Sequence, residues 1–200
     1  MIKNVFLFAL KPESHLRNID CVILYFTLIA IPRIIIFSIA QLYLIDEEMQ
    51  TPDIKFALKA ILLAPFIETM LFFGPIIFFP LKEGTFRWIK IIGFGSVFAL
   101  SHSIFDDRPI WSVIFQLWSG LVMAFVYDDC LRRDKSSVWI VTAIHTATNT
   151  MGFLFLCIAY FVTQKIATTE FRFIIFMAIM LALIFVLSFR ASQIEKKYRA

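Results

Sequence analysis

The stretch APFIETMLFFGPIIFFP (Ala64–Pro80) contains a single charged residue, Glu68, among apolar and aromatic residues. No other charged residue occurs from Ala60 to Leu81, and a helix of this length can cross about 30 Å of hydrocarbon. An ionisable group within a membrane is energetically unfavourable, so it is by default a candidate for function. The stretch therefore predicts a transmembrane helix and marks Glu68 as a functional residue.

The whole chain has the composition of an integral membrane protein. Its 200 residues are 60% hydrophobic and 17% charged, whereas soluble domains are about one half apolar and one quarter charged. The hydrophobic segments are Cys21–Ile45, Ile54–Leu81, Trp88–Phe105, Pro109–Tyr127, Ser137–Val162 and Phe173–Phe189. Backbone groups in lipid must be hydrogen-bonded within their own segment, so each segment is expected to be helical. The sequence predicts an all-α, polytopic membrane bundle with about six transmembrane helices.

The distribution of lysine and arginine predicts the orientation of this bundle. Of the 19 basic residues, 13 lie in the two tails and in the loops after the second and fourth segments, and 5 lie in the opposite loops. The positive-inside rule then places both termini in the cytoplasm. The net charge of +4 fits attraction to anionic lipid, and no nucleic-acid partner is expected. The expected parts are an N-terminal interfacial segment (1–20), a transmembrane bundle (21–189) and a basic cytoplasmic tail (190–200).

Three further polar residues lie inside hydrophobic segments: His102 in the third, and His145 and Asn149 in the fifth. At ~1.5 Å per residue from the cytoplasmic helix ends, Glu68, His102 and Asn149 lie roughly 18–21 Å deep and His145 about 12 Å deep. His145 and Asn149 share a helical face because they are spaced i, i+4. One site formed by all four residues is therefore expected. For each residue taken alone, the alternative is an interhelical hydrogen bond with a purely structural role.

Three short motifs follow one another in this region: APFIETMLFFG (Ala64–Gly74), FALSH (Phe98–His102) and HTATN (His145–Asn149). In order and spacing they resemble the motifs of the CAAX protease and bacteriocin-processing (CPBP) intramembrane endopeptidases, which read roughly A-P-x-x-E-E-x-x-F-R-G, F-x-x-x-H and H-x-x-x-N. The resemblance covers a core at about residues 60–155. It implies a multi-pass protease of a bacterial plasma membrane that hydrolyses a peptide bond in a membrane-associated or lipidated protein substrate.

The resemblance also implies a role for each of the four polar residues. Glu68, helped by His102, would activate a water molecule, because a carboxylate in apolar surroundings binds a proton more readily than one in water. His145 and Asn149 would stabilise the oxyanion. Glu68, His102 and His145 could instead ligate zinc with one position open, but no H-E-x-x-H helix is present. We therefore expect no required cofactor, with zinc as the alternative.

The first motif departs from the family pattern at two positions. The second glutamate of the pattern is Thr69 here, and its arginine is Phe73. Removing one partner of a buried ion pair would cost about 3–5 kcal/mol, so the joint loss indicates a pair replaced by neutral packing. The departures favour a second reading, a weak or inactive family member that binds a peptide or partner as an immunity or scaffold protein. A small transporter is a third, although no pair of Gly/Pro-broken helices supports it.

Two other charged residues bear on this site. Arg33 follows Pro32 within the first segment, where its side chain could extend to the membrane surface or contact a kinked backbone. We expect it to face the bundle and to compensate Glu68 in place of the missing motif arginine. Asp106 follows His102 by four residues and could orient its ring, with a solvated aspartate at a helix end as the alternative.

Overall fold

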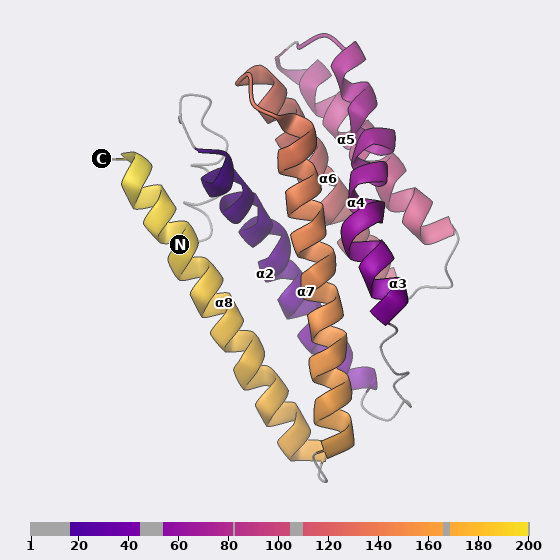
Figure 1. The fold of residues 1–200 in the computed structure, drawn as a ribbon, viewed down its shortest axis with the longest axis vertical. Coiled ribbons are helices and arrows are strands. Elements are labelled where there is room, and N and C mark those ends of the chain that lie inside the picture. The colour runs from indigo at the N-terminus through magenta and orange to yellow at the C-terminus, as the bar shows by residue number, and fades with distance from the viewer. Residues whose placement is uncertain (1–16, 45–53, 82, 105–109, 166–168, 200) are drawn as a thin grey trace.

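The fold is a bundle of six helical stretches (Figure 1). The computed structural model describes residues 17–44, 54–81, 83–104, 110–165 and 169–199. The stretches are α2 (Asn18–Leu44), a composite helix from α3 (Ile54–Leu58) to η3 (Gly74–Phe78), α5 (Thr85–Ile104), α6 (Ile110–Arg132), α7 (Ser137–Lys165) and α8 (Thr169–Arg199). No strand occurs within these ranges. The predicted all-α architecture is confirmed, while Asp106 and most of the N-terminal segment lie outside the described residues.

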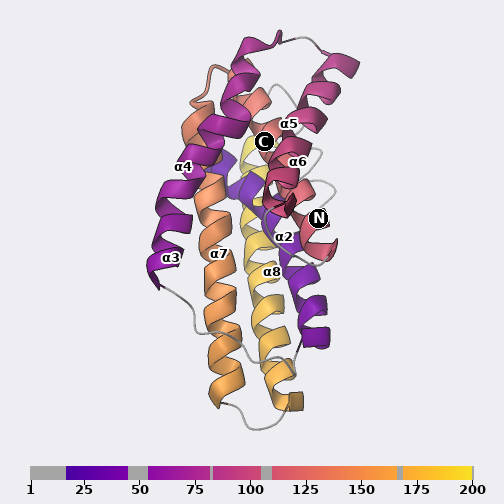
Figure 2. The same ribbon diagram turned by 90° about the vertical axis from the view of Figure 1, so that its right-hand side faces the viewer.

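Successive stretches run in opposite directions along the bundle (Figures 1 and 2). The upper end of the bundle in Figure 1 therefore contains the starts of α2, α5 and α7 and the ends of α6 and α8. This end carries Arg17, Arg87, Arg132, Arg133 and Lys197, and we call it the basic end. The loops after the second and fourth hydrophobic segments, which the distribution of lysine and arginine assigned to one side of the membrane, thus lie at one end of the molecule.

Among the residues that the structure describes, five helices are long and apolar enough to cross a membrane: Asn18–Ile35, Lys59–Phe78, Val113–Arg132, Ser137–Val162 and Met177–Ile194. The chain is accordingly an integral membrane protein. Within the described residues, α5 is not among these spans, although its sequence was expected to supply one. It carries Arg87 and Lys90 in its first half and packs mainly against α6.

Two helices extend past their expected ends at the basic end of the bundle. α6 was expected to end at Tyr127 but continues to Arg132, because Asp128 and Asp129 are buried and paired with basic side chains. α8 was expected to end near Phe189, and its helix continues to Arg199 through the basic tail. Charged residues that resemble a loop in sequence therefore form regular helix here.

Two prolines shape the composite helix that carries Glu68. Proline has no backbone N–H, and its ring clashes with the carbonyl group four residues earlier. Before Pro65 the helix widens into the π-helical turn η1 (Lys59–Leu63), and before Pro75 into η2 (Thr69–Phe73). Between these turns lies the short helix α4 (Ala64–Glu68), so that Glu68 directly precedes η2. π-Helical turns are rare and frequently occur at functional sites.

Helices α5 and α6 cross in direct backbone contact at two glycines. A Cβ atom on Gly120 would lie 2.4 Å from the carbonyl oxygen of Gly95 and 3.0 Å from Cδ1 of Phe98. A Cβ atom on Gly95 would lie 2.8 Å from the Cα atom of Leu121. Small residues permit this close approach in membrane helices. The crossing lets Phe98, which is fully buried, reach the centre of the bundle.

Candidate active site

Glu68 on α4 lies between two histidines from two other helices. Its Oε2 atom is 3.2 Å from Nε2 of His102 on α5 and 3.4 Å from Nε2 of His145 on α7. The side chains of Glu68 and His102 are each 23% exposed, and that of His145 is 4% exposed. The structure thus brings together three of the four residues that the sequence marked, in a site that is largely closed.

The orientation of the His102 ring follows from contacts within its own helix. Its Nδ1 atom lies 2.9 Å from the carbonyl oxygen of Phe98 and 3.2 Å from Oγ of Ser101, whose hydroxyl donates to the same carbonyl. A carbonyl oxygen only accepts, so Nδ1 carries the hydrogen and neutral His102 presents a lone pair at Nε2. Its contact with a carboxylate oxygen then requires a shared proton. The Glu68–His102 pair is thereby arranged to take up and return a proton.

His145 approaches the same carboxylate oxygen from the buried side. Its Nδ1 atom is buried and has no hydrogen-bond partner within the described ranges. A neutral His145 with its hydrogen on Nε2 donates toward Glu68. The two imidazoles therefore present different groups to one carboxylate, a lone pair from His102 and an N–H group from His145.

An aromatic side chain supports both imidazole rings. The ring centroid of Phe98 lies 4.4 Å from that of His102 and 5.5 Å from that of His145. Phe72 packs edge-on against Phe98, with 5.6 Å between their centroids. Phe98 was expected only as part of a motif, although its position four residues before His102 places both rings on one helical face. The site is therefore lined by apolar rings on the side of Phe98.

Both departures from the family pattern point into the core. Thr69 and Phe73 are fully buried, and the ring of Phe73 packs against Phe98 with centroids 5.3 Å apart. Apolar packing thus occupies position 73, as the joint loss of glutamate and arginine predicts. The hydroxyl of Thr69 has no hydrogen-bond partner among the described residues. A polar atom next to Glu68 is therefore left with unused hydrogen-bonding capacity.

Asn149 contacts the composite helix two turns before Glu68. Its Nδ2 atom donates a hydrogen bond of 2.8 Å to the carbonyl oxygen of Ala60. In the π-helical pattern this carbonyl would accept from residue 65, which is a proline without an N–H group. Asn149 therefore supplies the donor that Pro65 removes. The amide keeps a second N–H group and its oxygen for other partners.

This relation predicts the effect of substituting Asn149. Asn149→Ala should lower stability by about 1–3 kcal/mol, because it leaves the Ala60 carbonyl without its side-chain donor. Adding Pro65→Ala should restore most of this loss, because residue 65 regains an N–H group that can donate to Ala60. Thermal unfolding of the two single variants and the double variant in detergent measures the coupling. Strictly additive effects would contradict the relation between Pro65 and Asn149.

Arg33 faces the interior of the bundle, as expected. Its Nη1 atom donates to the carbonyl oxygen of Thr148 at 3.1 Å, and its guanidinium carbon lies 4.7 Å from the ring centroid of Phe115. Gly152 permits this approach, since a Cβ atom there would lie 2.9 Å from Nη2 of Arg33. The expected contact with Glu68 is not what the structure shows: the ion pairs found for Glu68 are with the two histidines. The reason is that Arg33 is held by the backbone of α7.

Glu68, His102 and His145 are also the expected ligands of the alternative zinc site. Both Nε2 atoms contact the same oxygen of Glu68, and no group of three or more His, Cys, Asp or Glu side chains within the described ranges is arranged to hold a metal ion. The contacts around Glu68 are thus carboxylate–imidazole contacts at ion-pair distance.

Comparison with known proteins adds one match. The family model of the Rce1-like proteins, described as type II CAAX prenyl endopeptidase Rce1-like, matches residues 50–151. No curated protein and no solved structure matches the chain. The matched region includes Glu68, His102, His145 and Asn149, whereas Arg33 and the whole of α8 lie outside it.

Proposed function

We propose that this chain, which belongs to the Rce1-like family of type II CAAX prenyl endopeptidases, hydrolyses a peptide bond of a membrane-associated substrate. The observation that carries the proposal is the position of Glu68, whose carboxylate contacts histidines from two further helices within 3.4 Å. A carboxylate and an imidazole that share a proton can deprotonate water, which peptide hydrolysis requires. A purely structural role would not require both histidines at one oxygen.

In the proposed reaction, water is the nucleophile. The Glu68–His102 pair accepts one proton from the water while its oxygen bonds to the carbonyl carbon of the substrate. The carbonyl oxygen becomes an oxyanion, which accepts from the second N–H group of Asn149 and from Nε2–H of His145 once the Glu68–His102 pair holds the proton of water. The C–N bond then breaks as the pair returns the proton to the leaving amine. Atoms and charge balance with water as the only co-reactant.

The substrate class we propose is a prenylated or otherwise lipidated peptide. The face of the composite helix around Glu68 is apolar and exposed, with Ile67 51% and Leu71 64% accessible. Such a face lies in hydrocarbon, where a lipid-modified peptide also resides. We further propose that the basic end faces the cytoplasm of a bacterial plasma membrane, in accordance with the positive-inside rule.

The test uses the purified full chain in liposomes and two synthetic peptides. Both end in a C-a-a-X sequence, and only one carries a farnesyl group on its cysteine. We expect cleavage of the farnesylated peptide by the wild-type protein and little cleavage of the unmodified one. Cleavage of neither peptide, together with saturable binding of the farnesylated one, would replace this proposal by the binding function that Thr69 and Phe73 favour. Comparative peptidomics of membranes with and without the active protein would then identify other substrates.

A chelator test addresses metal dependence. We expect cleavage rates in 1,10-phenanthroline or EDTA to stay within about twofold of the untreated rate, because acid–base chemistry by Glu68 and His102 needs no Lewis acid. Added zinc should not raise the rate. Loss of activity on chelation that zinc restores would instead assign Glu68, His102 and His145 as metal ligands.

A further inference from the structure

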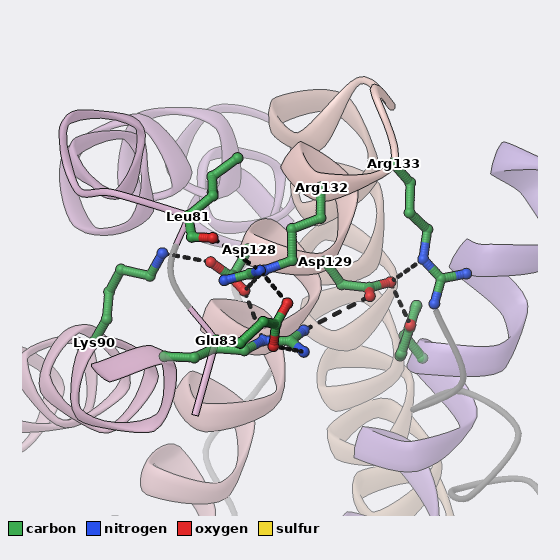
Figure 3. A network of polar contacts seen from close by, with 9 residues as sticks. Leu81, Glu83, Lys90, Asp128, Asp129, Arg132 and Arg133 are labelled. Atoms are coloured by element: carbon green, nitrogen blue, oxygen red, sulfur yellow. Dashed lines mark hydrogen bonds and ion pairs between the residues drawn. The ribbon is translucent and has the colours of Figure 1, made fainter. Parts of the chain in front are cut away.

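The buried carboxylate of Asp128 on α6 forms ion pairs with basic side chains of two helices at the basic end (Figure 3). Oδ1 of Asp128 lies 2.5 Å from Nζ of Lys90, and Oδ2 lies 2.8 Å from Nε of Arg87 and 2.6 Å from Nε of Arg132. The side chains of Lys90 and Asp128 are 1% and 0% exposed. We call these four residues the Asp128 cluster. It joins α5, which supplies Arg87 and Lys90, to α6.

The cluster is itself held in place by its surroundings. Arg132 donates to the carbonyl oxygen of Leu81 at 3.3 Å and also pairs with Glu83, both in the connection before α5. On the other side, Asp129 accepts from the hydroxyl of Tyr25 on α2 at 3.1 Å. These contacts fix the end of α6, so the Asp128 carboxylate has a defined position relative to α5.

Along α5, the cluster lies on the opposite side of the glycine crossing from the candidate active site. Lys90 precedes Gly95, and His102 follows Lys90 by 12 residues, which is about 18 Å along the helix axis. The crossing of Gly95 and Gly120 brings the two backbones together through contacts of backbone atoms. Ile91 and Phe98 of α5 add apolar packing to the crossing. Apolar packing has no preferred direction, whereas charge-assisted contacts add geometric specificity and can fix the axial position of α5.

The ring of His102 moves with α5 as one unit. Its Nδ1 atom is bound to the carbonyl oxygen of Phe98, one turn earlier on the same helix. The position of its Nε2 atom relative to Glu68 therefore depends on where α5 lies against the rest of the bundle. At a contact distance of 3.2 Å, a shift of about 1 Å is enough to break the pairing.

We propose that the Asp128 cluster sets the axial position of α5 and thereby positions His102 against Glu68, an inference that rests on the proposed function. Lys90 and Arg87 are spaced i, i+3 on one face of α5, and both reach Asp128. A displacement by one residue would move them about 1.5 Å along and 100° around the helix, away from this carboxylate. Buried ionic groups are known to fix the alignment of packed helices, whereas their net contribution to stability is small. Lys90 is therefore a residue that positions His102 through α5.

The test removes one cation and observes the histidines directly. The chain has only 3 histidines, so selective ¹⁵N-histidine labelling gives a simple spectrum, in which the His102 signals are those missing from His102→Gln. In Lys90→Met we expect the Nε2 signal of His102 to shift while that of His145 stays in place. The kcat for the farnesylated peptide should fall roughly 10- to 100-fold, with KM within about twofold, because misplacement by 1 Å has effects of this size. Lys90→Arg should restore both signals and rate.

Arg133→Met is the matched control. Arg133 pairs with Asp129 on its own helix at 2.9 Å, and its side chain is 9% exposed. Asp129 also lies 3.7 Å from Arg87, but the variant leaves the contacts of Lys90, Arg87 and Arg132 with Asp128 in place. Lys90→Gln, which keeps a donor toward Asp128, is the second variant should Lys90→Met not fold. An unchanged His102 signal in the folded Lys90 variant, or an equal shift in Arg133→Met, would overturn the proposal. The histidine spectrum can be recorded without turnover. Absence of cleavage by the wild-type protein would therefore refute the proposed function, whereas the shift of the His102 signal would still test the role of the Asp128 cluster.

Discussion

Glu68→Gln is expected to lower the rate of peptide cleavage by about 10²–10⁴-fold, the usual contribution of general acid–base catalysis. The amide has nearly the shape of the carboxylate but cannot accept the proton of water. The contact with His145 can persist, because an amide oxygen in the place of Oε2 still accepts from Nε2–H of His145. The bundle should therefore remain folded, and the loss should appear in kcat.

Cleavage of the farnesylated peptide in liposomes measures this effect, with thermal unfolding as the check on folding. Glu83→Gln is the matched control, since it makes the same chemical change in a side chain that is 73% exposed. The glutamine oxygen can still accept from Arg132, and exposed ion pairs contribute little, so this variant should retain nearly full activity. Full activity of a folded Glu68→Gln variant would contradict the catalytic assignment and favour a binding role.

Gly120→Ala is expected to lower both stability and activity. The added methyl group would lie 2.4 Å from the carbonyl oxygen of Gly95, which is backbone and cannot move aside without displacing α5. Overpacking of this kind costs about 1–3 kcal/mol. The same methyl group meets the ring of Phe98, which contacts both imidazoles, so activity should fall as well.

Gly93→Ala provides the control on the same helix pair. No atom lies within 4 Å of the place where its Cβ would be, and alanine is favoured over glycine in a helix by about 1 kcal/mol. This variant should unfold at the wild-type temperature or above it. Thermal unfolding and cleavage rates of both variants decide the matter, and a Gly120→Ala variant as stable as Gly93→Ala would disprove a close crossing of α5 and α6.

The sequence predicted the helical segments well where they are apolar and less well where charges continue a helix. The stretch around Glu68 has one charge in over 20 residues and could be assigned to the membrane without structural information. Asp128 and Asp129 looked like the start of a loop, because the cations that make them compatible with a buried helix come partly from α5. Pairing across helices cannot be read from one segment, and the end of α6 was therefore misplaced.

The candidate site shows the same division. Depth along each helix placed Glu68 and His102 at one level, since the rise per residue is constant. The roles of neighbouring residues were not accessible in this way. Two contacts depend on how the helices are rotated about their axes. Asn149 donates to the Ala60 carbonyl, which lacks a donor because of Pro65, and Arg33 donates to the backbone of α7.

The sequence by itself determined that this protein is a helical membrane bundle with a carboxylate and two histidines within it. An unpaired backbone N–H or C=O group is energetically unfavourable in hydrocarbon, so long apolar segments of a membrane protein form helices. Only the tertiary structure decided that Glu68 contacts both His102 and His145, and that Asp128 pairs with Arg87 and Lys90 of α5. These contacts join side-chain atoms about 3 Å apart on different helices, so they depend on how the helices pack against one another and not on the pattern of any single segment.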